Sequence, residues 1–131
     1  MTPQPDPYDD GMRIRREVLG DAHVDRAESS KTPFTSDFQG LITRYAWGSV
    51  WARPGLDRRA RSIAVLTALL AMRHWEEFAM HVRAARTNGL TDDEIAEVIV
   101  QSAIYCGVPV ANHAFVVARD VLDQLNQEVA P

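Results

Sequence analysis

Three side chains that can exchange protons or bind a metal recur along one stretch of the chain: His74, Glu77 and His81. In a helix, at about 100° per residue, they fall within an arc of roughly 60° on one face. An apolar stripe adjoins that arc, so desolvation and mutual charge can move the pKa values of these groups toward neutrality. The spacing is compatible with acid–base catalysis, with a two-histidine, one-carboxylate metal site, or with an edge salt-bridge cluster that performs no chemistry.

A second group combines two arginines with two tryptophans around a Pro-Gly break: Arg44, Trp47, Trp51 and Arg53. The planar guanidinium of arginine matches a carboxylate, and indole rings can wall a small pocket. This group is therefore a candidate site for a small carboxylate. The same pattern also fits tryptophans in a core or an interface, with the arginines as solvated surface charges.

The remaining candidates are a histidine between two aspartates, His23, and a single cysteine, Cys106. His23 is either a general acid–base or part of a surface turn. One cysteine cannot form an intrachain disulfide or an all-cysteine metal cage within one chain, and nothing in the sequence around Cys106 indicates a reactive thiolate.

The composition describes the domain that must position these residues. The chain has 131 residues, is 46% hydrophobic and 24% charged, and carries a formal net charge of −4. This length and apolar content predict one folded domain over residues 11–131, with residues 1–10 as a flexible N-terminal arm. The acidic balance argues against nucleic-acid binding. Because no apolar run approaches the ~20 residues of a membrane span, we expect a cytoplasmic protein without membrane contact.

Hydrophobic periodicity and capping residues predict an all-α fold of about six helices. A polar connector is expected over residues 21–33, and Gly48 is expected to break a helix that begins at Ser36 or Asp37. From Ile63 to Met72 only Thr67 is polar, so this helix is expected at the centre of the molecule. The expected helices cover residues 12–19, 36–47, 57–72, 74–88, 91–106 and 109–127.

Several motifs, in order, resemble the 4-carboxymuconolactone decarboxylase family. The resemblance begins with Met12–Arg26, Ile42–Gly48 and Trp51–Leu56 and extends over about residues 11–126. Further matching segments are Arg61-Ser62, Glu76-Glu77, His81–Ala85, Asn88–Ile95, Glu97–Gln101 and Ala103–Pro109. Alkylhydroperoxidases of the wider superfamily carry a Cys-x-x-Cys-x-x-x-His motif. Here His74, Glu77 and His81 occupy its three positions, and the missing dithiol counts against peroxidase chemistry.

The resemblance implies an all-helical subunit in a ring-like homo-oligomer, a hexamer or a trimer. It implies decarboxylation of 4-carboxymuconolactone, a dianionic lactone, to 3-oxoadipate enol-lactone and CO2 in the protocatechuate branch of the β-ketoadipate pathway. No cofactor and no metal are implied. A relative acting on another lactone, or a non-catalytic helical scaffold or sensor, are the alternatives.

Within that family, we expect His81 to be the general acid and Glu77 to hold its tautomer or relay the proton. The expected substrate-binding residues combine cationic clamps, aromatic walls and two further histidines: Arg44, Arg53, Arg61, Trp47, Trp51, His23 and His74.

Overall fold

The computed structural model describes residues 5–129, and within this range it contains seven α-helices and one π-helix but no strand. The expected all-α fold is therefore confirmed. The chain forms two compact units, Met1–Leu56 and Asp57–Pro131, which we call the N-terminal unit and the C-terminal unit. The expectation of a single domain over residues 11–131 stays a prediction. Residues 1–4 of the expected arm lie outside the described range.

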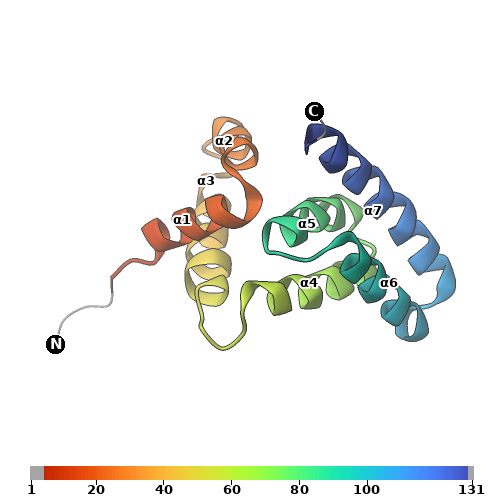
Figure 1. Ribbon diagram of the computed structural model, residues 1–131. Helices are drawn as coiled ribbons and strands as arrows, with labels where there is room; N and C mark the ends of the chain where they lie inside the picture. The colour runs from red at the N-terminus through yellow and green to blue at the C-terminus, as the bar shows by residue number, and fades with distance from the viewer. Residues whose placement is uncertain (1–4, 130–131) are drawn as a thin grey trace. The chain divides into compact units, whose positions relative to one another are not determined.

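The N-terminal unit begins with two consecutive helices, α1 (Tyr8–Leu19) and α2 (Asp21–Ser29) (Figure 1). Helix α1 starts four residues before the expected boundary and ends as predicted at Gly20, whose φ of 89° suits glycine. The predicted polar connector over residues 21–33 is wrong for its first part, which is α2. Only Val24 of α2 is fully buried, so the segment has too few apolar residues to produce a periodic signal.

Helix α3 (Ser36–Leu41) continues directly into a π-helix, η1 (Ile42–Trp51). The predicted break at Gly48 is therefore wrong. A Cβ atom at Gly48 would lie 2.4 Å from the carbonyl oxygen of Pro7, so glycine is needed here for a close backbone approach. The widened backbone of a π-helix is rare and often marks a functional site.

Helix α1 packs across η1 at a second close approach (Figure 1). A Cβ atom at Gly11 would lie 2.0 Å from the carbonyl oxygen of Thr43, so only glycine lets the two backbones meet. The buried side chains of this unit are few, and two of them are polar: Ile14, Arg15, Val18, Leu19, Val24, Thr43 and Trp47.

The C-terminal unit consists of α4 (Arg58–Met72), α5 (Trp75–Thr87), α6 (Asp92–Cys106) and α7 (Val108–Val129). Its helix ends follow the predicted caps. The carboxylate of Asp57 accepts a 2.8 Å hydrogen bond from the Ala60 N–H, and Thr91 forms a capping box with Glu94. Gly107, with φ 104°, separates α6 from α7, and Pro109 lies in the first turn of α7 as predicted.

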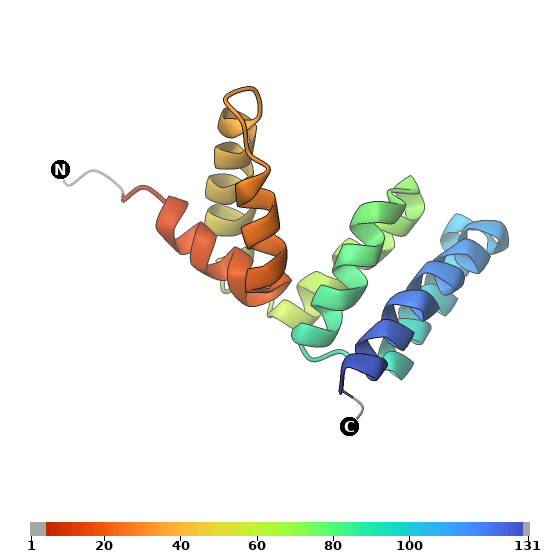
Figure 2. The same cartoon turned by 90° about the horizontal axis from the view of Figure 1, so that it is seen from above.

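The four helices of this unit enclose an apolar core, with α7 running alongside both α5 and α6 (Figure 2). The expectation that α4 is a central helix is wrong, since Ile63 and Met72 are 41% and 66% exposed. Helix α4 packs on α5 and α6, while several of its apolar residues, namely Ile63, Ala64, Ala68 and Met72, are exposed. The core residues are Leu66, Leu70, Phe78, Val82, Ala85, Leu90, Ile95, Ile99, Val110, Ala111, Ala114 and Ala118.

No helix within residues 5–129 is long and apolar enough to cross a membrane.

Candidate active site

His81, in the C-terminal unit, is the only buried histidine among the described residues, with 7% of its surface exposed. It lies on α5 between Phe78 and Val82, which are both fully buried. Helix α5 forms here because its apolar residues recur at helical spacing and acidic Glu76 and Glu77 occupy its first turn, where they complement the helix dipole. The fold therefore places one imidazole at the border of a dry core.

The other two members of the predicted trio lie in different surroundings. Glu77, one turn before His81 on α5, is exposed to solvent, and His74 is the exposed N-cap residue that precedes the helix. Among the described residues, no three His, Cys, Asp or Glu side chains converge as a metal site would require. The geometry therefore gives no support to the metal interpretation of His74, Glu77 and His81.

The nine predicted site residues divide between the two units. Four belong to the C-terminal unit. Half-buried Arg61 lies on α4, Glu77 and His81 lie on α5, and His74 precedes α5. The N-terminal unit contains the remaining five, namely His23, Arg44, Trp47, Trp51 and Arg53.

The two tryptophans of the N-terminal unit stack on each other at the end of η1. Their ring centroids are 5.1 Å apart and the planes are inclined by 33°. Trp47 is buried and Trp51 half-buried, whereas Arg53, just beyond η1, is exposed. The aromatic pair thus provides a packed surface with one partly accessible ring, as expected for a wall or a core element.

Arg44 lies on η1 and borders an open hollow of about 550 Å³. Its Nε donates a 3.1 Å hydrogen bond to the Asp6 carboxylate, and its guanidinium carbon lies 5.1 Å from the centroid of the Tyr8 ring. The hollow is lined by Tyr8, Lys31, Ser36, Asp37, Gly40, Leu41, Arg44 and Tyr45. Of the predicted clamps, Arg44 therefore has a cationic group beside a space for a ligand.

His23 lies on α2, and the pKa of its imidazole is lowered, first by burial and then by the positive charges of Arg15 and Arg26. The neutral form is thereby favoured near physiological pH. Because His23 lies within a helix and is half-buried, the surface-turn interpretation is wrong.

Arg15 is a charged residue of this unit that the sequence interpretation missed. It is 5% exposed, and it donates hydrogen bonds to the Thr43 hydroxyl at 3.4 Å and to the Gln39 side chain at 3.3 Å. The Glu28 carboxylate lies 3.7 Å away. A signal existed in the sequence, because Arg15 occupies an inward position of α1, four residues after Gly11 and one after Ile14.

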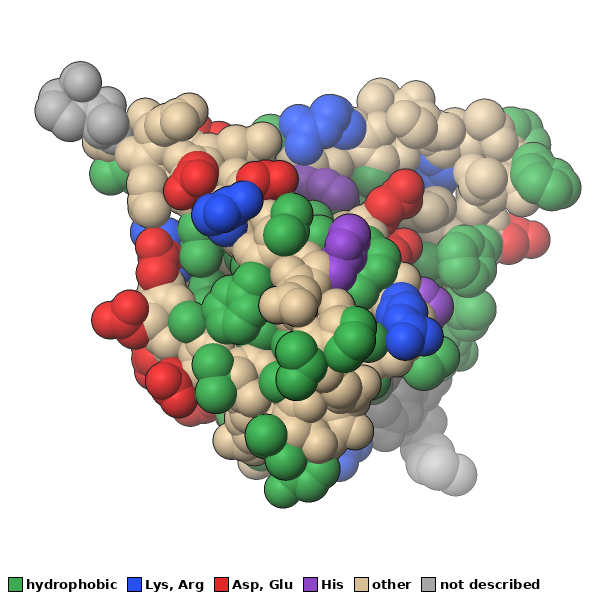
Figure 3. Space-filling model, turned by 90° about the vertical axis from the view of Figure 1, so that its right-hand side faces the viewer, with side chains coloured by type: hydrophobic (Ala, Val, Ile, Leu, Met, Phe, Trp, Pro, Cys, Tyr) green, Lys and Arg blue, Asp and Glu red, His purple; other side chains and the backbone are tan. Residues whose placement is uncertain are grey.

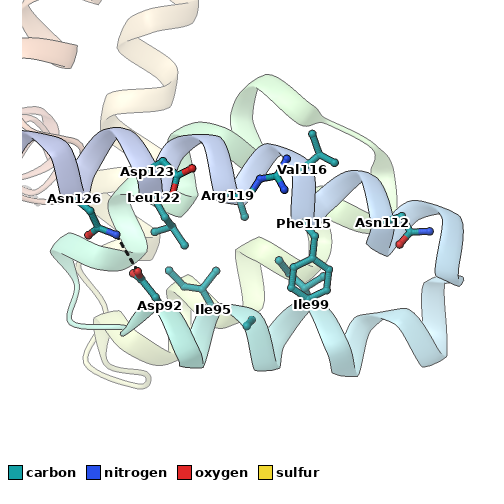
Figure 4. Close-up of a pocket in the computed structure, with 12 residues that line it drawn as sticks. Asp92, Ile95, Ile99, Asn112, Phe115, Val116, Arg119, Leu122, Asp123 and Asn126 are labelled. Atoms are coloured by element: carbon teal, nitrogen blue, oxygen red, sulfur yellow. Dashed lines mark hydrogen bonds between the residues drawn. The ribbon is translucent and has the colours of Figure 1, made fainter.

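A hollow of about 560 Å³ lies between α6 and α7 (Figure 4). Its walls are mainly apolar, and at one end the Asn126 side chain donates a 3.2 Å hydrogen bond to the Asp92 carboxylate. None of the predicted site residues is among those that line it, which are Asp92, Ile95, Ala96, Ile99, Asn112, Phe115, Val116, Ala118, Arg119, Leu122, Asp123 and Asn126.

Comparison with known proteins gives three informative matches. Residues 36–120 match the Carboxymuconolactone decarboxylase family. The chain is 43% identical to a 4-carboxymuconolactone decarboxylase of Acinetobacter baylyi over 95% of this chain and 91% of the relative. It is 41% identical to a nitrosuccinic acid decarboxylase of Metarhizium robertsii over 90% of this chain and 82% of the relative.

Proposed function

Because this chain belongs to the carboxymuconolactone decarboxylase family, we propose that it decarboxylates 4-carboxymuconolactone to 3-oxoadipate enol-lactone and CO2. The observation that carries this proposal is the 43% identity to a 4-carboxymuconolactone decarboxylase over 95% of the chain. The position of His81 at the edge of an apolar core supports it, since a proton donor beside a water-poor space suits the reaction.

The chemistry needs no electron sink from outside the substrate. When CO2 leaves the γ-carbon, the electron pair passes through the ring double bond onto the lactone carbonyl oxygen. The protein must then stabilise the resulting dienolate oxygen and protonate the α-carbon. In this proposal His81 delivers that proton, and Glu77 orients the imidazole or returns a proton to it from solvent. No cofactor and no metal take part.

Binding a dianion is the second requirement. Arg44, Arg53 and Arg61 are the proposed carboxylate clamps, and Trp47 and Trp51 are proposed to exclude water from the ring. Equal stabilisation of both carboxylates in the ground state adds nothing to turnover. The clamps therefore act on the carboxylate that stays, while the departing one is left in a drier setting.

A second substrate follows from the relative from Metarhizium robertsii. Nitrosuccinic acid is also a dicarboxylic acid, and the electron pair left by loss of CO2 beside the nitro group is accepted by that group. Because this relative is 41% identical, nitrosuccinic acid belongs in the same assay. The same proton donor and the same carboxylate clamp serve both substrates.

The test is release of CO2 and loss of the lactone by the purified protein, with nitrosuccinic acid assayed in parallel. We expect turnover to survive exhaustive chelation and the substitution Cys106→Ser, because the substrate accepts the electrons and one thiol cannot supply a dithiol. Loss of turnover on metal removal, with helicity retained, would establish a metal-dependent reaction instead. A protein inactive on both acids would support the scaffold interpretation.

We also propose that the chain assembles into a homo-oligomer, a trimer or a hexamer. Apolar side chains gather on the side of the C-terminal unit where α6 meets α7 (Figure 3). Ile104 and Tyr105 at the end of α6 are 80% and 83% exposed, and such surfaces commonly mark subunit contacts. Light scattering should show an oligomer that Ile104→Glu dissociates and that Gln124→Glu, on exposed α7, leaves intact. A wild-type monomer at micromolar concentration would contradict this.

A further inference from the structure

One short segment at the start of the N-terminal unit holds the guanidinium of Arg44 in place. The Asp6 carboxylate accepts both the Arg44 Nε–H, at 3.1 Å, and the backbone N–H of Tyr8, at 3.0 Å. The Tyr8 ring lies against the same guanidinium, 5.1 Å from its carbon. The two hydrogen bonds, that from Tyr8 first, lower the pKa of Asp6, so this carboxyl is ionised at neutral pH. We call Asp6-Pro7-Tyr8 the strap.

The strap is seated on η1 by backbone contacts. The Pro7 carbonyl accepts a 2.8 Å hydrogen bond from the Gly11 N–H, and it lies where a Cβ atom at Gly48 would be only 2.4 Å away. Two glycines therefore bring the strap within reach of Arg44. The contact between Asp6 and Arg44 itself remains open to water, with 61% and 41% of the two side chains exposed. An ion pair this exposed is weak and can be exchanged for another carboxylate.

The opposite edge of the Arg44 guanidinium lies over a backbone surface. Nη1 is 2.8 Å from the position of a Cβ atom at Gly40, so the absence of a side chain there leaves room for the planar group. On this side the hollow of about 550 Å³ opens, with Arg44 and Lys31 as its cationic residues and Asp37 as its one acidic residue among those described. The Lys31 ammonium donates to Glu28 at 3.0 Å, and two of its three N–H groups are left for another acceptor.

We propose that this hollow is a carboxylate-binding site in which Arg44 and Lys31 take one carboxylate of a dicarboxylic ligand, and that Asp6 is an internal carboxylate which competes with it. The ligand carboxylate takes the edge of Arg44 that faces the hollow, while Asp6 on the Nε edge neutralises part of the same positive charge and so weakens the attraction for the ligand. The inference rests on the proposed function in its choice of a dicarboxylate ligand. It adds a specific subsite and an internal competitor to that function.

The expected effects follow from what each group contributes. Removing an exposed competing ion pair should tighten ligand binding about twofold to fivefold. Removing the clamp should weaken binding at least about tenfold, because a charge-assisted hydrogen bond is lost. Since Asp6 acts only through Arg44, its removal should have no effect once Arg44 is gone. This coupling separates competition at one guanidinium from a general effect of surface charge.

The experiment measures the dissociation constant of succinate, an unreactive dicarboxylate, by calorimetry and NMR titration, together with the KM for the lactone. The variants are Asp6→Asn, Arg44→Ala and the double variant. Asp10→Asn is the matched control, because this exposed aspartate of α1 pairs with Arg13 at 3.5 Å instead of Arg44. Circular dichroism and thermal melting establish that each variant is folded. Asp6→Ala is included as well, because the amide oxygen introduced by Asp6→Asn could still accept a hydrogen bond from Arg44.

We expect Asp6→Asn and Asp6→Ala to lower both constants, Asp10→Asn to change neither, and the double variant to match Arg44→Ala. If Arg44→Ala leaves succinate binding unchanged, the hollow is no carboxylate site and the inference is overturned. If Arg44→Ala weakens binding but both Asp6 variants match the wild type, the proposed competition by Asp6 is refuted. Failure to decarboxylate the lactone would refute the proposed function alone, because succinate binding still decides on the subsite.

Discussion

The two units of the chain bury different kinds of side chain. The C-terminal unit encloses a continuous apolar cluster that includes Leu70, Phe78 and Ile99. The N-terminal unit buries few apolar residues and places the charged Arg15 and the hydroxyl of Thr43 among them. Stability in the first comes from apolar area removed from water. In the second it depends on glycine-mediated backbone approaches and on side-chain hydrogen bonds such as those from Arg15 to Thr43 and Gln39.

The proposed roles divide in the same way. The proposed proton donor, His81, belongs to the apolar unit, where only 7% of its surface is exposed. The proposed carboxylate clamp, Arg44, belongs to the polar unit, where it forms an ion pair with Asp6. Substitutions in the C-terminal unit should therefore affect kcat or stability strongly. Those in the N-terminal unit should affect ligand affinity and the response to pH.

The largest effect is expected at His81. His81→Ala should lower kcat by roughly 10²–10⁴-fold, the usual contribution of a positioned general acid, with a smaller change in KM. His81→Gln, which retains most of the side-chain volume, should lose a similar factor. Steady-state kinetics on folded variants measures both, and His113→Ala on exposed α7 serves as the control. If both His81 variants retain wild-type kcat, the proton donor is another residue, and His23 is the next to test.

The apolar core is probed by Phe78, which has no exposed surface. Phe78→Ala should lower the free energy of unfolding by about 3–5 kcal/mol, because the lost transfer energy and the remaining cavity add. Phe34→Ala, at a side chain that is 96% exposed, should change it by less than about 0.5 kcal/mol. Urea unfolding at fixed protein concentration measures both. Equal losses would mean that Phe34 is covered in solution, for example by another subunit.

Local signals in the sequence were sufficient for the helix boundaries of the C-terminal unit, although not for the position of α4. The Asp57 cap, the capping box at Thr91 and the pair Gly107 and Pro109 each act within a few residues, so the sequence predicts these boundaries directly. The N-terminal unit depends on contacts between distant segments. Gly48 was interpreted as a helix breaker, whereas its role is to admit Pro7, and no local pattern reveals a partner forty-one residues earlier.

The same contrast applies to the candidate site. Helical spacing correctly predicted the helix that carries His81, but spacing places residues on a face without saying how deeply each is buried. Glu77 and His81 are one turn apart on the same helix, yet Glu77 is exposed and His81 is buried. The pairing of Arg44 with Asp6 joins residues thirty-eight positions apart. Only the packing of α1 on η1 brings them together.

A smaller loss is expected in the polar unit on replacing its buried charge. Arg15→Met removes hydrogen bonds to Thr43 and Gln39 while keeping most of the aliphatic volume and should cost about 1–3 kcal/mol of unfolding free energy. Arg13→Met, on the exposed side of the same helix, should cost less than about 0.5 kcal/mol. Denaturant unfolding compares the two. If Arg15→Met raises the unfolding free energy, an apolar side chain stabilises this site better than the buried charge with its hydrogen bonds.

The smallest effect concerns the pH dependence that His23 contributes. Its pKa is lowered from the ordinary 6.5, first by burial and then by Arg15 and Arg26, so the unfolded chain binds a proton more readily than the folded one. Between the lowered pKa and 6.5, the unfolding free energy must therefore rise with pH, and this contribution becomes constant above that window. At lower pH the imidazole is charged in both states and the penalty is complete.

His23→Gln should remove this contribution, so the variant should gain stability relative to the wild type as the pH falls from about 8 to about 5.5. Because burial is the largest cause of the lowered pKa and Arg15 only the second, Arg15→Met should keep most of the pH dependence. Unfolding curves of the three proteins at both pH values measure these differences. Parallel curves for His23→Gln and the wild type would contradict the assignment. Complete loss of the dependence in Arg15→Met would show that charge, and not burial, dominates in this unit.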